Sequence, residues 1–426
     1  MTKIEGVRAR RIWDSRGRPT VEVDVLIQGG LRGRGVAPAG ASRGEAEAID
    51  LRDGGHRFGG YDVQNALAAV RGEIAETIIG LDVIDQRSID ETLIALDGTP
   101  NRSRLGGNAM VATSMAVLRA AASAAGEPLW RYLADGKPVR LPLPEIQIFG
   151  GGVHAARRVD IQDFLVMPVG AESFTQALEM VADVYAAAGE LMVRNGPLTG
   201  VADEGGYWPN FDSNEDALTT LTRAIEAAGY GNGEVMISLD IAASQFYEDG
   251  HYKLGLDDHS FDTGEWIEVL ASWIGTYPIL SIEDPVNECD RDGMIAITQL
   301  LGDKLQIIGD DYLVTSTGRV QAAQAEGAGN AVLLKPNQVG TITETLDALV
   351  AARATGWGTV VSARSGETED DIISDLSVGW NAGQLKVGSI TRSERTAKWN
   401  QVLRIEEMLG DKAVYAGRSA LPQALQ

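Results

Sequence analysis

The C-terminal part of the chain repeats one pattern, in which a short apolar run ends in a charged residue and a segment of helical period follows. The runs lie at residues 235–239, 281–282, 305–309, 331–334, 358–362 and 384–385. Their length is typical of buried strands, and the intervening segments have the period of amphipathic helices. Parallel strands joined by helical crossovers can close into a barrel, which carries its chemistry at the C-terminal ends of its strands.

Charged residues stand at those predicted strand ends. Asp240, Glu283 and Asp310 end successive strands, and Lys335 ends the next one. A single acid at such a place is as readily the N-cap of the following helix. Three acids in register instead favour a cluster of hard oxygen ligands, the kind of site that suits Mg²⁺.

The N-terminal part has a different pattern. Apolar residues alternate at 4–13 and 20–27, which predicts two strands of a small antiparallel sheet. The glycine-rich stretch 29–35 is interpreted as a turn, and the segment that follows, with Ser42 and Arg43, as a mobile loop. Helical patterns then run through 63–79, 85–96 and 108–124. We therefore predict two domains, 1–135 and 136–426.

Composition narrows the class of protein. At 426 residues the chain is longer than one core usually covers, which agrees with two domains. A net charge of −23 argues against a nucleic-acid partner or an anionic membrane surface. No apolar run approaches the roughly 20 residues of a membrane span, and the single cysteine, Cys289, fits a reducing compartment. We expect a cytoplasmic protein that draws anionic substrates in through local cations or a metal.

Several long motifs in a fixed order resemble the enolase family over nearly the whole chain. They are Asp14-Ser15-Arg16-Gly17, Asp97-Gly98-Thr99-Pro100-Asn101, Asp203-Glu204-Gly205-Gly206, Ser281-Ile282-Glu283-Asp284-Pro285, Gly309-Asp310-Asp311, Arg364-Ser365-Gly366-Glu367 and Arg392-Ser393-Glu394-Arg395. The resemblance implies an α/β protein with an N-terminal α+β domain and a C-terminal variant (β/α)8, TIM-like barrel whose first strands depart from simple alternation. It also implies a homodimer or a higher homo-oligomer.

Carried over position by position, the resemblance implies roles for individual residues. Lys335 matches the base that removes the proton beside the substrate carboxylate, and Glu204 matches the acid that assists departure of the hydroxyl. The ligands of a tightly held Mg²⁺ would be Asp240, Glu283 and Asp310, with Ser42 at a second Mg²⁺ that arrives with the substrate. Substrate contacts would be His154, Gln162, Asp163, Arg364, Ser365 and Lys386. A lysine must be neutral to act as a base, and we expect Mg²⁺ and Lys386 to lower its pKa by charge repulsion.

Three departures from the family pattern fall in the site motifs. Ala363 stands where enolases have a histidine, Asp163 replaces a glutamate, and Arg43 replaces a threonine beside Ser42. The residues predicted to transfer protons and bind metal match the family pattern, whereas residues at the end that would hold phosphate differ from it. The guanidinium of Arg43 could bind an additional anion there through two parallel hydrogen bonds.

These departures favour one function among several. The chain resembles diverged enolases of phosphonate antibiotic pathways, the carboxyphosphonoenolpyruvate synthases, which implies a phospho-acid substrate of the 2-phosphoglycerate or phosphoenolpyruvate type and a nucleotide-activated phosphonoformate. One alternative is an ordinary phosphopyruvate hydratase that tolerates the changes. Two others are an inactive enolase and a non-catalytic binding or scaffold protein, against which the surviving metal ligands argue.

Overall fold

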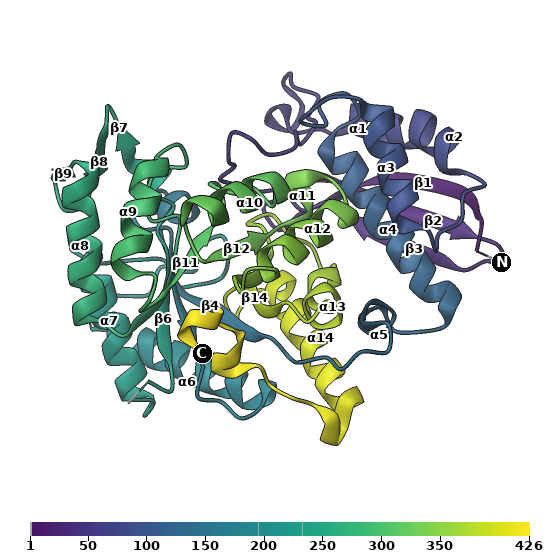
Figure 1. Ribbon diagram of the computed structural model, residues 1–426. Helices are drawn as coiled ribbons and strands as arrows, with labels where there is room; N and C mark the ends of the chain where they lie inside the picture. The colour runs from purple at the N-terminus through teal and green to yellow at the C-terminus, as the bar shows by residue number, and fades with distance from the viewer. Residues whose placement is uncertain (1, 195, 232) are drawn as a thin grey trace.

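The computed structural model describes residues 2–194, 196–231 and 233–426. Its N-terminal part is a three-stranded antiparallel sheet in the order β1-β2-β3, covered on one face by helices (Figure 1). The elements are β1 (Ile4–Trp13), β2 (Pro19–Ile27), β3 (Arg32–Val36), α1 (Gln64–Ala69), α2 (Ala75–Ile78), α3 (Gln86–Asp97), α4 (Gly107–Ala125) and α5 (Leu129–Ala134). A short π-helical segment at 70–74 joins α1 to α2, so the helix predicted over 63–79 is present but irregular.

The glycine-rich stretch 29–35 is not only a turn, and this part of the sequence interpretation is wrong. Residues Gly29 and Gly30 make the turn, and the chain then returns as β3 against β2. A Cβ on Gly33 would lie 2.0 Å from the Ala116 carbonyl oxygen, and one on Gly35 would lie 2.3 Å from the carbonyl oxygen of Ala112. These two glycines therefore allow α4 to pack directly on the strand backbone.

The C-terminal part contains a closed eight-stranded barrel in the order β10-β11-β12-β13-β14-β4-β5-β6. Its strands are β4 (Leu143–Gly150), β5 (Asp163–Met167), β6 (Met236–Asp240), β10 (Ile279–Glu283), β11 (Gln306–Gly309), β12 (Ala331–Leu334), β13 (Gly358–Ser362) and β14 (Gly383–Gly388). Strand β5 pairs antiparallel with both β4 and β6, and the other pairs are parallel. The predicted variant barrel with irregular first strands is confirmed.

Helices surround this barrel on the outside (Figure 1). They are α6 (Phe174–Val193), α7 (Asn214–Ala227), α8 (Thr263–Thr276), α9 (Arg291–Leu301), α10 (Thr317–Glu326), α11 (Pro336–Val339), α12 (Ile342–Arg353), α13 (Ile372–Gly379) and α14 (Ser393–Leu409). A small separate sheet of β7 (Tyr247–Glu248), β8 (His251–Leu254) and β9 (His259–Phe261) projects from the barrel beside α8. Among the described residues, no helix has the length and apolar character needed to cross a membrane.

Loops of the N-terminal part reach the barrel strand ends. The Ala39 amide donates to the Gly366 carbonyl at 2.9 Å, and the Ala48 amide donates to the Gln338 carbonyl at 2.7 Å. Because of these contacts, the site described next is assembled from both parts of the chain, inside the molecule.

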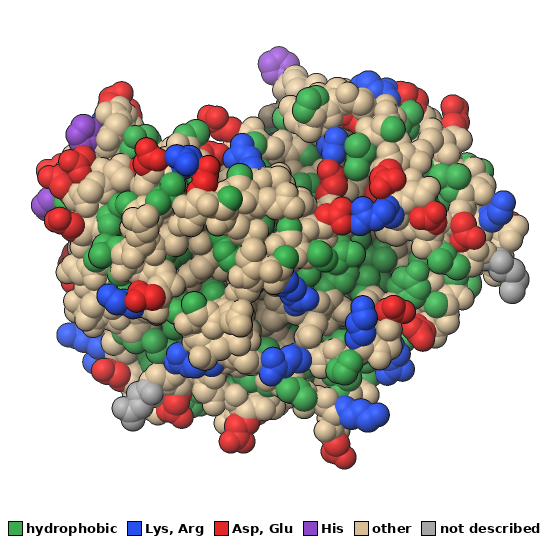
Figure 2. All heavy atoms as spheres, viewed as in Figure 1, with side chains coloured by type: hydrophobic (Ala, Val, Ile, Leu, Met, Phe, Trp, Pro, Cys, Tyr) green, Lys and Arg blue, Asp and Glu red, His purple; other side chains and the backbone are tan. Residues whose placement is uncertain are grey.

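Acidic and basic side chains are intermixed over the face of the molecule seen in Figure 2.

Candidate active site

A pocket with a cavity volume of about 20 Å³ lies at the C-terminal ends of the barrel strands. Most of its lining residues are polar, and Gly40 and Ser42 come from the N-terminal loop that follows β3. The predicted site residues in its lining are Ser42, His154, Gln162, Asp163, Glu204, Asp240, Lys335, Arg364, Ser365 and Lys386. Parallel strands end at one edge of the barrel, so side chains far apart in sequence meet here.

One side of the pocket, called the carboxylate wall, consists of Asp240, Glu283 and Asp310 with the lysines Lys335 and Lys386. Asp240 and Glu283 are direct partners in the β6–β10 pairing. The ammonium of Lys386 bonds both of them, at 2.8 Å to Asp240 Oδ2 and 2.6 Å to Glu283 Oε2. Burial opposes its charge, but the two carboxylates outweigh burial and raise the pKa of Lys386 well above its usual value. Lys386 is therefore a fixed cation of this wall.

Lys335 occupies the equivalent place beside Asp310. Its ammonium bonds Asp310 Oδ2, and the amide of Gln338 donates to the other oxygen, Asp310 Oδ1, at 2.9 Å. Burial lowers the pKa of Lys335, but the negative charges of Asp310 and Glu283 outweigh it and the net shift is upward. The expected lowering by Lys386 is present and too small to prevail. In the protein without a metal ion the predicted base is therefore protonated, and the lowering of its pKa by Mg²⁺ stays a prediction.

The side chains of the carboxylate wall are of the type that binds a divalent cation. Glu283 Oε1 is buried without a hydrogen-bond partner, and burial together with the negative charge of Asp240 raises the pKa of Glu283 well above its usual value. Three acids face two lysines, so the wall has an excess of negative charge and an oxygen free to bind a hard cation. These features suit a binding site for Mg²⁺.

Ligand atoms within 4.8 Å of one another form two other groups in the described part of the chain. They are His154, Asp163 and Glu204, and Asp284, Asp310 and Asp311. Asp284 also accepts the backbone amides of Asp310 and Asp311, at 2.9 and 2.7 Å, so it fixes the strand end that carries Asp310. The predicted triad thus shares Asp310 with a compact acidic group, and its other members, Asp240 and Glu283, are bridged by Lys386.

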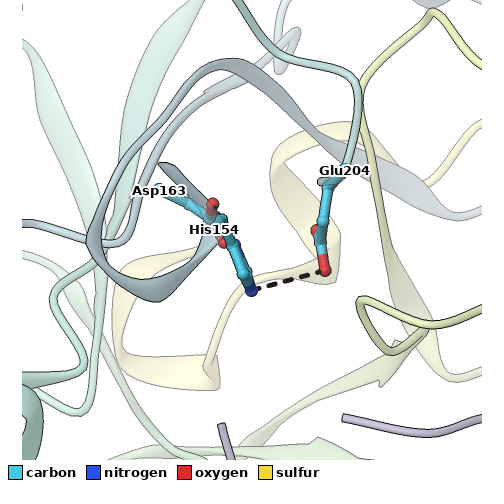
Figure 3. Close-up of side chains that lie close together, drawn as sticks. All are labelled: His154, Asp163 and Glu204. Atoms are coloured by element: carbon cyan, nitrogen blue, oxygen red, sulfur yellow. Dashed lines mark hydrogen bonds and ion pairs between the residues drawn. The ribbon is translucent and has the colours of Figure 1, made fainter. Parts of the chain in front are cut away.

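A neighbouring side, called the histidine wall, consists of His154, Asp163 and Glu204 (Figure 3), and Asp163 is the direct strand partner of Asp240. His154 Nδ1 lies 3.0 Å from Asp163 Oδ1, and His154 Nε2 lies 3.9 Å from Glu204 Oε1. The imidazole therefore stands between two carboxylates, one from β5 and one from the loop after α6. Gln147 on β4 donates to Asp163 and accepts the Gly206 amide, which ties both acids into the barrel.

The proton of the histidine wall is not on the residue expected to be the acid, which was Glu204. Burial lowers the pKa of His154, but Asp163 and Glu204 outweigh burial and raise it to about 9. Burial raises the pKa of Glu204, but the charges of Arg395 and His154 outweigh burial and bring it below its usual value. At neutral pH the proton of the pair is therefore on His154, and Glu204 is a carboxylate.

A third side, called the arginine wall, consists of Ala363, Arg364 and Ser365, which follow β13. The Arg364 guanidinium pairs with Glu47 at 2.9 Å, and both side chains are 3% exposed. It also donates to the Ser42 carbonyl at 2.9 Å. A Cβ on Gly40 would lie 2.0 Å from Arg364 Nη2, so glycine is required for this close approach. The arginine is thus held by the N-terminal loop.

Three predicted residues do not line the pocket. Glu283 and Asp310 are buried behind its surface in the carboxylate wall. Arg43 is exposed and forms no ion pair with any described residue, although its neighbour Ser42 lines the pocket. The structure thus brings the predicted set together except for Arg43.

Sequence reasoning missed the residues that hold the site side chains in place. Gln338 belongs to a polar segment after β12, and Arg395 to a motif named above, so both carried a signal. Arg395 donates to the carbonyls of Arg364 and Ser365, each at 2.6 Å. Glu47 carried no signal, because nothing in a loop sequence indicates which arginine an acid will meet across the molecule.

A closed barrel with acids, buried lysines and a carboxylate-bound histidine at its strand ends defines the class of α/β-barrel proteins built for acid–base and metal chemistry. The chain matches the family model for the enolase C-terminal TIM barrel domain over residues 138–424 and the model for the enolase N-terminal domain over residues 4–133. It therefore belongs to the enolase family.

Proposed function

We propose that this protein is a Mg²⁺-dependent enzyme that acts on a three-carbon phospho acid of the 2-phosphoglycerate type, and that it is a carboxyphosphonoenolpyruvate synthase. The observation that carries the proposal is the contrast within one pocket. The carboxylate and histidine walls have a full set of proton-handling groups, whereas Ala363 contributes only a methyl group beside Arg364. The small side chain at that end supports a bound group other than the phosphate of an ordinary enolase substrate.

Lys335 is proposed to remove the proton from C2 of 2-phosphoglycerate, and the His154–Glu204 pair to deliver a proton to the departing hydroxide. The proton on His154, 3.9 Å from Glu204, supports this pairing. Asp240, Glu283 and Asp310 would hold Mg²⁺, which supplies positive charge that stabilises an enolate-type intermediate and favours the neutral lysine. Arg364 and Lys386 would orient the anionic ends of the substrate.

The transfer step is proposed to join this chemistry to a nucleotide-activated phosphonoformate. A bond forms between the enol oxygen and the phosphorus of the phosphonoformyl group, and the bond from that phosphorus to the nucleotide breaks, which releases a nucleoside monophosphate. The phosphoryl group of the acceptor leaves as inorganic phosphate, taking up the water eliminated in the first step. Overall, 2-phosphoglycerate and the activated phosphonoformate give carboxyphosphonoenolpyruvate, nucleoside monophosphate and phosphate.

Ordinary phosphopyruvate hydratase activity is the second candidate. Lys335 and Glu204, the predicted base and acid, line the same pocket, and this favours it. The site has aspartate at 163 and alanine at 363, so we expect that activity to be weak, because loss of a positioned acid–base or orienting group costs about 10²-fold or more.

Two assays separate the candidates. Phosphorus NMR of protein, Mg²⁺, 2-phosphoglycerate and activated phosphonoformate should show a new phosphonate ester together with equal amounts of nucleoside monophosphate and phosphate. Ultraviolet absorbance should show slow formation of phosphoenolpyruvate from 2-phosphoglycerate alone. Rapid hydration–dehydration with no phosphonate ester would overturn the proposal in favour of the second candidate.

A further inference from the structure

A second cavity borders the segment that carries His154. Its cavity volume is about 440 Å³, against about 20 Å³ for the active-site pocket. His154 lines the smaller pocket, and Arg157, three residues later, lines the larger one. The other residues used below, Gln245, Phe246, Tyr247 and Lys253, come from the segment between β6 and β9.

Size separates the roles of the two cavities. Small-molecule sites usually enclose roughly 300–1,000 Å³. The active-site pocket, at about 20 Å³, lies far below that range and has no space for a nucleotide. An activated donor that reacts there must therefore keep its nucleotide outside the pocket, and the larger cavity has the necessary volume.

A hydrogen-bonded pair of amide side chains stands between the two cavities. Gln162 lines the active-site pocket and donates to Asp240 Oδ2 at 2.9 Å. Gln245 lines the larger cavity and donates to the Gln162 side-chain oxygen. Gln245 is itself fixed by the Val153 amide, which donates to its oxygen at 3.1 Å. A ligand in the larger cavity therefore lies one amide pair away from the carboxylate wall.

The larger cavity offers a cation for a phosphate and rings for a base. Arg157 is exposed and forms no ion pair with any residue that the structure describes. Lys253, in contrast, is paired with Glu248 at 2.9 Å. Phe246 and Tyr247 are each packed against further rings of an aromatic cluster, with centroid distances of 5.6 Å to Trp266 and 4.8 Å to Tyr252. Fixed aromatic rings are surfaces on which nucleobases stack.

The backbone that presents Arg157 is strained. Ala156 and Arg157 have φ values of 50° and 55°, in the left-handed region that residues with a Cβ rarely adopt. The Arg157 amide donates to the Gly152 carbonyl at 2.6 Å, which helps to hold this turn. Strain of this kind persists where surrounding structure fixes it, and it clusters at ligand-binding segments.

We propose that the larger cavity binds the nucleotide of the activated donor, with Arg157 on its phosphate and the Phe246–Tyr247 wall against its base. The inference rests on the proposed function. A guanidinium suits this task because it binds phosphate oxygens in a bidentate manner.

The test uses the full chain and Arg157→Gln, with Arg158→Gln as the matched control. Arg158 is the next residue, is also exposed, and is absent from the lining of the cavity. Each of the four common ribonucleoside 5′-monophosphates is titrated by calorimetry in the presence of Mg²⁺ and 2-phosphoglycerate. We expect one of them to bind, Arg157→Gln to weaken it about 10- to 150-fold, and Arg158→Gln to change it by less than about twofold. Circular dichroism checks that both variants are folded.

The phosphorus NMR assay on the wild-type protein separates this inference from the proposed function. If the phosphonate ester forms and Arg157→Gln binds the monophosphate as tightly as Arg158→Gln does, the proposed function stands and the subsite is wrong. If a monophosphate binds with the expected dependence on Arg157 but no ester forms, the subsite stands and the transfer reaction is wrong. If no monophosphate binds at millimolar concentration and no ester forms, both are wrong.

Discussion

The carboxylate wall and the histidine wall face the same pocket, but they carry their positive charge in different ways. In the carboxylate wall, Lys335 and Lys386 are permanent parts of the structure, and one oxygen of Glu283 still lacks a partner. In the histidine wall, the positive charge among the three members is on the protonated imidazole of His154. The first wall thus combines two lysines with an oxygen available to a cation, whereas the second holds its positive charge as a proton on His154.

The largest effect should come from removing the carboxylate with the free oxygen. Glu283→Ala is expected to abolish Mg²⁺ binding and all activity, because it leaves Lys386 without one of its partners and the cation without a ligand. Titration calorimetry with Mg²⁺ measures the change.

Glu145→Gln is the matched control for that variant. Glu145 is a fully buried barrel carboxyl that accepts from Ser238 at 2.8 Å and lies outside the predicted triad. Its replacement should leave Mg²⁺ affinity nearly unchanged. Equal affinity in wild type and Glu283→Ala would show that the ion binds elsewhere, for example at the group around Asp284.

The next largest effect concerns the predicted base. Lys335→Arg keeps a cation beside Asp310, but arginine does not give up its proton in proteins. Exchange of the C2 proton of 2-phosphoglycerate in deuterated water with Mg²⁺ should therefore fall about 10²- to 10⁴-fold, while the protein stays folded. Proton NMR follows the exchange, and an unchanged rate in the variant would refute the assignment of Lys335.

The histidine wall should be visible in the pH dependence of stability. The pKa of His154 is about 9 in the folded protein, above its ordinary value of 6.5. Its stabilising contribution is therefore complete below about pH 6.5 and is lost as the pH rises through 9. Urea unfolding across this range should show a decline in wild type that is smaller in His154→Gln.

His251→Gln is the control, because His251 is an exposed histidine on β8. It should show the same decline as wild type. A decline of equal size in His154→Gln would mean that the proton is held elsewhere.

The smallest expected effect belongs to Arg43, which is exposed in the structure. If the Ser42 loop moves so that Arg43 reaches the donor, Arg43→Thr should weaken use of the activated phosphonoformate about tenfold, the lower end of the range for a charged hydrogen bond. The KM for the donor measures this. An unchanged KM would identify Arg43 as a solvated surface residue.

The two walls also differ in how far sequence alone could describe them. Asp240, Glu283 and Asp310 could be located because each follows a short apolar run, and parallel strands bring their ends together. His154 and Glu204 were found only through family motifs, because they lie on a short 3-10 segment and a loop, where local patterns indicate no partner. Even on the carboxylate wall, the upward shift in the pKa of Lys335 depends on distances to Asp310 and Glu283 that no sequence spacing contains.

Close backbone packing was the other limit on prediction. Gly33 and Gly35 were interpreted as turn residues, because glycine in a loop and glycine under a helix look alike in sequence. Only the position of α4 against β3 distinguishes the two. The irregular helix at 64–78 was missed in detail for the same reason, since its hydrophobic period is retained through the π-helical segment.

The pair formed by Glu47 and Arg364 has a consequence for modularity. Glu47 lies in the stretch matched by the enolase N-terminal model, and Arg364 lies in the stretch matched by the barrel model. A barrel expressed alone would lose both this counter-ion and the Ser42 carbonyl that accepts from Arg364. The two stretches are thus matched separately in sequence but share a buried ion pair, so a change to Glu47 in one of them affects the arginine of the other.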